Sequence, residues 1–77
     1  MKMNELTKGE KRIFNELIEG FSYKEISQNL GLSIATVKSH VMSILKKTYA
    51  DDSKKLIVQY YKELLKIQRF GKGADNV

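Results

Sequence analysis

The spacing of glycine in a chain without proline constrains the fold more than any other feature of this sequence. Proline is absent from all 77 residues, so the strongest helix breaker interrupts no segment. Gly20 and Gly31 instead follow segments whose apolar residues recur at helical spacing. A chain of this length can bury one small hydrophobic core. These observations predict a single all-α domain.

Side chains typical of helix starts precede the predicted helices. Thr7 with Glu10 has the spacing of a capping box, in which two unpaired backbone N–H groups are satisfied, and Ser22 with Glu25 repeats it. Further caps are predicted at Ser33 and at Asp52 or Ser53. The predicted helices cover about residues 7–19, 22–30, 33–48 and 53–70, with a flexible tail at 71–77. The second and third helices are separated by a short turn with glycine, which is typical of a helix-turn-helix.

Basic residues exceed acidic ones, and the excess lies in the second half of the chain. Lysine and arginine number 14 against 9 aspartates and glutamates, a formal net charge of +5. Residues 1–32 are balanced, whereas residues 33–50 contain three lysines and no acid. A basic domain of this size indicates a polyanionic partner, of which nucleic acid is the commonest.

Several classes of protein are disfavoured by what the sequence lacks. Without cysteine the chain has no disulfide framework and no thiolate metal site. Its apolar runs are far shorter than the roughly 18 to 20 residues that span a bilayer, so we expect a cytoplasmic protein with no membrane partner. His40 is the only histidine, and it has neither an evident catalytic pair nor further metal ligands. We therefore expect no enzyme, no metal site and no cofactor.

The predicted third helix has one face suited to a polyanion. If Val37, Val41 and Ile44 point into the core, the opposite face is small, polar or basic. It consists of Ala35, Lys38, Ser39, Met42 and Lys46. Such a face can approach bases in the major groove and has no carboxylate that would repel phosphate. An ordinary solvent-exposed helix with a few lysines is the alternative.

Other residues around this helix are candidates for phosphate contacts. Ser33 and Thr36 lie at its N-terminus, where free backbone N–H groups and the helix dipole favour an anion. Lys24 in the second helix, and Lys46 and Lys47 near the end of the third, could flank the groove.

The order of these residues also resembles a known family. The likeness is carried by the runs Leu6-Thr7-x-x-Glu10, Gly20-x-Ser22-x-Lys24-Glu25-Ile26, Leu32-Ser33-x-x-Thr36-Val37-Lys38-x-His40 and Val41-x-x-Ile44-Leu45-Lys46-Lys47. These runs match the LuxR/GerE-type helix-turn-helix family without gaps, over roughly residues 6–57. In length the chain is similar to the stand-alone, GerE-like members of that family.

The resemblance implies a bacterial, sequence-specific regulator of transcription that binds double-stranded DNA as a homodimer. Its third helix would lie in the major groove, and its long fourth helix would form the dimer contact. Carried over by position, Lys38, Ser39 and Met42 fall where the family contacts base edges. The positions at or near backbone contacts are Lys24, Ser33, Thr36, Lys46 and Lys47.

The chain departs from the family pattern after Lys47. The family usually continues with leucine, glycine and valine and then a turn with arginine, where this chain has Thr48-Tyr49-Ala50-Asp51-Asp52-Ser53. Two aspartates there would repel phosphate. Residues 20–39 alone are also similar to region four of bacterial sigma factors, although the run from His40 to Lys47 favours the LuxR/GerE type.

The predicted fourth helix has more apolar residues than one buried stripe needs. We interpret the excess as a dimer interface, made by Leu56, Tyr60, Tyr61, Leu64 and Ile67. The alternative is an adaptor protein in which residues 54–70 bind another regulator or RNA polymerase. Stacking of single-stranded nucleic acid on the tyrosines is a weaker interpretation.

Overall fold

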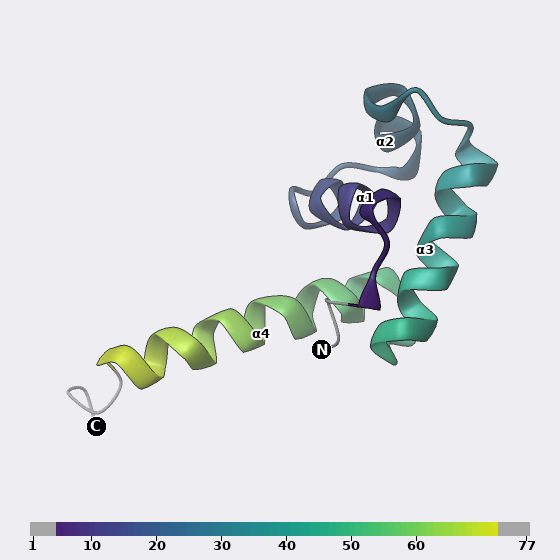
Figure 1. The fold of residues 1–77 in the computed structure, drawn as a ribbon. Helices are drawn as coiled ribbons and strands as arrows, with labels where there is room; N and C mark the ends of the chain where they lie inside the picture. Colours follow the sequence, from purple (N-terminus) through teal and green to yellow (C-terminus); the bar gives the residue numbers. More distant parts are fainter. Residues whose placement is uncertain (1–4, 73–77) are drawn as a thin grey trace.

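The computed structural model describes residues 5–72, and their side chains as far as Lys66, as four helices in succession (Figure 1). They are α1 (Lys8–Ile18), α2 (Tyr23–Leu30), α3 (Ile34–Thr48) and α4 (Ser53–Lys72). The described residues contain no strand, which confirms the predicted all-α class. Helix α4 continues two residues beyond its predicted end at 70, and residues 73–77 of the predicted tail lie outside the described residues.

Both predicted capping boxes are formed. In the first, the Glu10 N–H donates to Thr7 Oγ1 at 3.1 Å and the Thr7 N–H donates to Glu10 Oε1 at 2.8 Å. Ser22 and Glu25 repeat the arrangement at 3.2 and 2.8 Å. These bonds satisfy backbone donors that have no partner within the helix, so they fix where α1 and α2 begin.

The other helix ends follow local chemistry as well. Ser33 caps α3 by accepting from the Thr36 N–H, and Asp52 caps α4 by accepting from the Lys55 N–H at 2.8 Å. Gly31 ends α2 in the left-handed conformation at φ +68°, which glycine adopts without steric cost. Tyr49 ends α3 at φ +58°, in the same region of conformational space, and is not a glycine.

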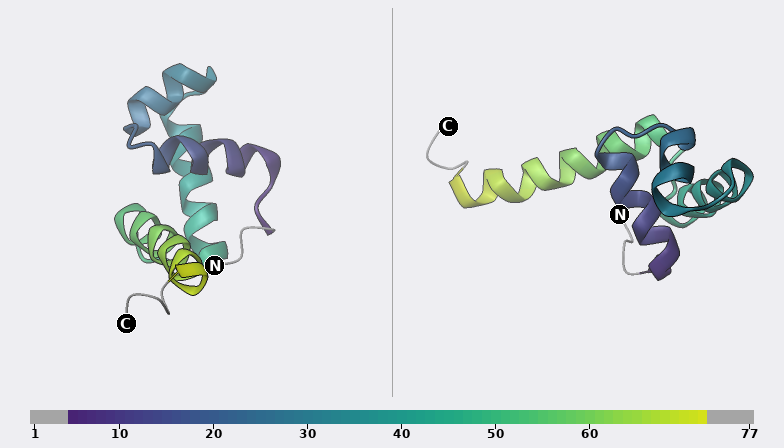
Figure 2. Two further views of the ribbon diagram at one scale, coloured as in Figure 1. Left: turned by 90° about the vertical axis from the view of Figure 1, so that its left-hand side faces the viewer. Right: turned by 90° about the horizontal axis from the view of Figure 1, so that it is seen from above.

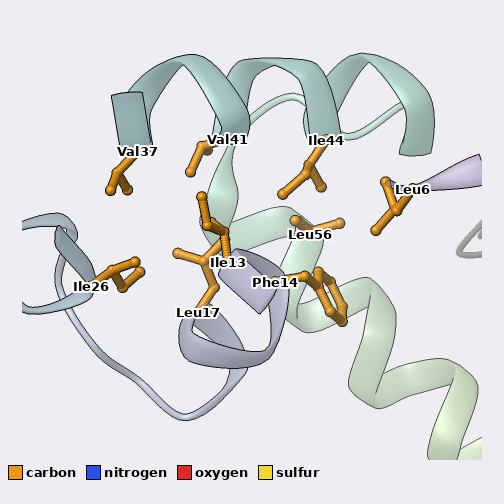
Figure 3. Close-up of a cluster of buried hydrophobic side chains, with 9 residues drawn as sticks. All are labelled: Leu6, Ile13, Phe14, Leu17, Ile26, Val37, Val41, Ile44 and Leu56. Carbon is orange, nitrogen blue, oxygen red and sulfur yellow. The ribbon is translucent and has the colours of Figure 1, made fainter. Parts of the chain in front are cut away.

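Side chains from all four helices, and from the segment before α1, meet in one core (Figure 3). Its fully or nearly fully buried members are Leu6, Ile13, Phe14, Leu17, Ile26, Val37, Val41, Ile44 and Leu56. The predicted inward face of α3 is confirmed, because Val37, Val41 and Ile44 point toward α1 and α2 in Figure 3.

Helix α4 projects away from the bundle that α1, α2 and α3 form (Figure 2). The molecule measures 47 × 21 × 20 Å, with a radius of gyration of 14.2 Å. A compact chain of this length would have a radius of gyration near 11.5 Å, so the projecting helix accounts for the difference. No helix in the described part of the chain is long and apolar enough to cross a membrane.

Candidate nucleic-acid interface

Helix α3 presents to solvent the face predicted from the sequence. Its exposed side chains include Ala35, Lys38, Ser39, Met42 and Lys46, on the side opposite the buried valines and isoleucine. Met42 is 60% exposed although it is apolar. This exposed face of α3 has two lysines and no acid, which is the composition that a helix in the major groove of DNA would need.

The N-terminus of α3 is open to solvent and held in place by two hydroxyl groups. Ser33 accepts from the Thr36 N–H at 3.0 Å and donates from its own Oγ to Thr36 Oγ1 at 2.8 Å. The N–H groups of Ile34 and Ala35 precede the first acceptor within the helix. Together with the helix dipole, they favour an anion at this end of the candidate interface.

Two acidic side chains lie just beyond the other end of α3, and each has a partner within the chain. Asp51, which was predicted to repel phosphate, forms an ion pair with Lys55 at 3.0 Å, and this pair raises the pKa of Lys55. Asp52 is engaged as the cap of α4. Both partners of the ion pair are exposed, so water and salt screen it strongly.

The lysines predicted to contact phosphate differ in whether they pair with another side chain of the protein. Lys24 on α2 and Lys46 on α3 have exposed side chains. Lys47 does not face the candidate interface freely, because its Nζ lies 2.8 Å from Oε1 of Glu10. The assignment of Lys47 as a DNA-backbone contact stays a prediction. Its charge is neutralised by a carboxylate of α1.

Glu10 is the centre of a buried polar cluster that the sequence did not predict beyond the capping box. Its side chain accepts from Lys47 Nζ, from Ser43 Oγ and from the Thr7 N–H. Burial alone raises the pKa of the Glu10 carboxyl, but these hydrogen bonds and the Lys47 charge outweigh it and lower the pKa to about 2. The cluster fixes α3 against the first turn of α1.

His40 lies beside the first turn of α1. A Cβ added to Gly9 would lie 3.9 Å from His40 Cε1, so the two residues are near neighbours. Among the described residues, no group of three histidine, cysteine or acidic side chains could hold a metal ion.

The residues predicted for a dimer contact separate into three groups. Leu56 is fully buried in the core of its own chain and cannot form that contact, which corrects the prediction. Tyr60 is half-buried and its ring packs edge-on against Phe14, with centroids 5.1 Å apart. Tyr61 and Leu64 are 45% and 37% exposed. The side chain of Ile67 lies outside the described residues.

Two residues that the sequence analysis did not assign are more exposed than these. Val58 is 51% and Leu65 57% exposed, and with Tyr61 they follow the i, i+3, i+7 spacing of one helix face. We call Val58, Tyr61, Leu64 and Leu65 the apolar face of α4. The sequence could have identified this face. If Leu56 is placed facing the core, the residues two and nine positions later, Val58 and Leu65, point to solvent.

Comparison with known proteins agrees with the geometry. The family model described as bacterial regulatory proteins, luxR family, matches residues 4–60, which include the first three helices and the start of α4. No curated protein and no solved structure matched the chain. Of the two resemblances noted for residues 20–39, the family match supports the LuxR/GerE type. The chain therefore belongs to the luxR family of bacterial regulatory proteins.

Proposed function

We propose that this protein is a homodimeric, sequence-specific regulator of transcription that inserts α3 into the major groove of double-stranded DNA. The exposed, acid-free face of α3 is the observation that carries the proposal. The family supports DNA binding and regulation in general terms, and the roles of single residues are our inference.

Different residues of α3 would contact the bases and the phosphates. Lys38, Ser39 and Met42 would contact base edges, with Met42 packing on a thymine methyl group. The N-terminus of α3, with Ser33 and Thr36, would bind a phosphate. Two further phosphate contacts would come from Lys24 and Lys46.

The apolar face of α4 supports a dimer. Its one contact with another helix that the structure describes is the Tyr61 hydroxyl, which donates to the Ile18 carbonyl oxygen at the end of α1 at 2.9 Å, whereas Val58, Leu64 and Leu65 are exposed. A solvent-exposed helix of this kind has little stability without tertiary packing. A second copy of α4 would cover the face, and two copies of α3 would then bind half-sites about one helical turn of DNA apart.

Selection from random duplex DNA tests the proposal. We expect enrichment of a motif with two related half-sites. We also expect Lys38→Ala to cost about 1–3 kcal/mol of binding free energy and to relax the preference at one position of each half-site. A uniform loss across sequences would make Lys38 a phosphate contact, and a selection without enrichment would overturn the proposed function.

A second candidate function follows from the same apolar face of α4. An adaptor protein would use it to bind another regulator or RNA polymerase. Sedimentation equilibrium separates the two, because a homodimer covers the face with a second copy whereas a monomer leaves it open to a different partner.

A further inference from the structure

We propose that Tyr49 is an additional DNA contact of this chain, with its hydroxyl donating a hydrogen bond to a phosphate at the edge of the major groove. The inference rests on the proposed function and assigns a role there to a residue at the very end of α3.

Tyr49 continues the exposed face of α3. Met42 and Lys46 follow Lys38 by four and eight residues, which places the three on one side of α3, and Tyr49 is the residue that ends this helix. Met42, Lys46 and Tyr49 also line one shallow surface hollow, together with Leu45, Ala50 and Asp51. The tyrosine is therefore part of the same surface as the predicted base contacts.

The backbone of Tyr49 is strained, and the Tyr49 and Ala50 N–H groups, which both donate to the Leu45 carbonyl oxygen, hold it in that conformation. A non-glycine residue at φ +58° is sterically disfavoured. The side chain is 80% exposed, and its hydroxyl makes no hydrogen bond with any described residue. Residues with a strained backbone cluster at binding sites, where the strained conformation is part of how the residue contacts its ligand.

Position along the helix favours a phosphate over a base edge. Eleven residues span about 17 Å of helix, which exceeds the groove width of about 12 Å. With Lys38 among the bases, Tyr49 would therefore lie beside the backbone. A tyrosine hydroxyl is a common phosphate donor. The neighbouring Asp51 is paired with Lys55, so its charge is partly offset.

Three variants test the contact on the selected duplex, with affinity measured over a range of salt concentrations. Tyr49→Phe should weaken binding about 10- to 100-fold, the net value of two hydrogen bonds, one from each copy in the dimer, without changing the salt dependence because no charge is removed. Lys46→Ala should reduce the magnitude of the log–log salt slope by about two, because each copy in the dimer loses one phosphate contact. Tyr23→Phe is the matched control, since its hydroxyl lies 3.3 Å from Ser53 Oγ within the chain, and it should bind as the wild type does.

Stability and footprinting separate a DNA contact from a structural role. Tyr49→Gly relieves the strain and should raise Tm by about 4 °C or more at matched protein concentration, while still weakening DNA binding. Ethylation interference should lose one phosphate per half-site in Tyr49→Phe. Equal affinity of wild type and Tyr49→Phe, or unchanged interference, would overturn the contact and leave the proposed function standing. A wild-type protein that binds no duplex at all would overturn both.

Discussion

The Nζ atom of Lys47 lies 2.8 Å from Oε1 of Glu10 and ties the last turn of α3 to the first turn of α1. Glu10 is only 4% exposed, and its second oxygen accepts from Ser43 at 2.5 Å. The carboxylate therefore joins a helix cap to two side chains of α3. Because the opposite face of α3 is the candidate DNA surface, this cluster sets the angle at which that surface is presented.

Removal of the carboxylate should destabilise the fold. Glu10→Ala leaves Ser43 and the Lys47 ammonium without their partner and should lower the free energy of unfolding by about 2–4 kcal/mol in urea denaturation. Glu25→Ala is the matched control, because Glu25 has the same place in the capping box of α2 but is exposed. The two variants losing equal stability would contradict a special role for the Glu10 cluster.

The same cluster predicts how stability depends on pH. The pKa of Glu10 is about 2 in the folded chain and near 4.5 in an unfolded one. A lowered folded pKa means that the contribution is fully present above about pH 5 and is lost as the pH falls toward 2, with an upper limit of about 3 kcal/mol. Glu10→Gln should therefore show a weaker fall in stability over this pH range. A fall as steep as that of the wild type would contradict the assignment.

Substitutions on α4 should separate the dimer contact from the core. Leu65→Lys adds charge to the apolar face and should convert a dimer to a monomer in sedimentation equilibrium. Leu56→Ala empties a core position and should cost about 2–5 kcal/mol of stability. A dimer that survives Leu65→Lys would place the interface elsewhere on the molecule.

Local patterns predicted the fold well because local chemistry determines it. The capping boxes at Thr7 and Ser22, the serine cap at Ser33 and the glycine end at Gly31 all involve residues within a few positions of one another. The inward face of α3 followed from helical periodicity alone. Hydrogen bonds between residues this close in sequence can be predicted without knowing how the helices pack.

Predictions that depended on packing between distant segments were less accurate. Glu10 and Lys47 are 37 positions apart, so their ion pair could not be inferred from spacing. Leu56 was assigned to a dimer contact because α4 has apolar residues on more than one face, and helical spacing alone does not say which face is buried in the core. Only the angle at which α4 meets α1 and α3 decides which leucines are buried.

The dependence of DNA affinity on salt tests the central claim most directly. Two copies, each with Lys24 and Lys46 on phosphates, would release about four counterions, a log–log slope near −3.6, and so lose about 150-fold in affinity between 50 and 200 mM salt. We expect that loss on the selected duplex, together with weaker binding to a scrambled duplex at every salt concentration. An affinity that is independent of salt and equal for both duplexes would contradict the account.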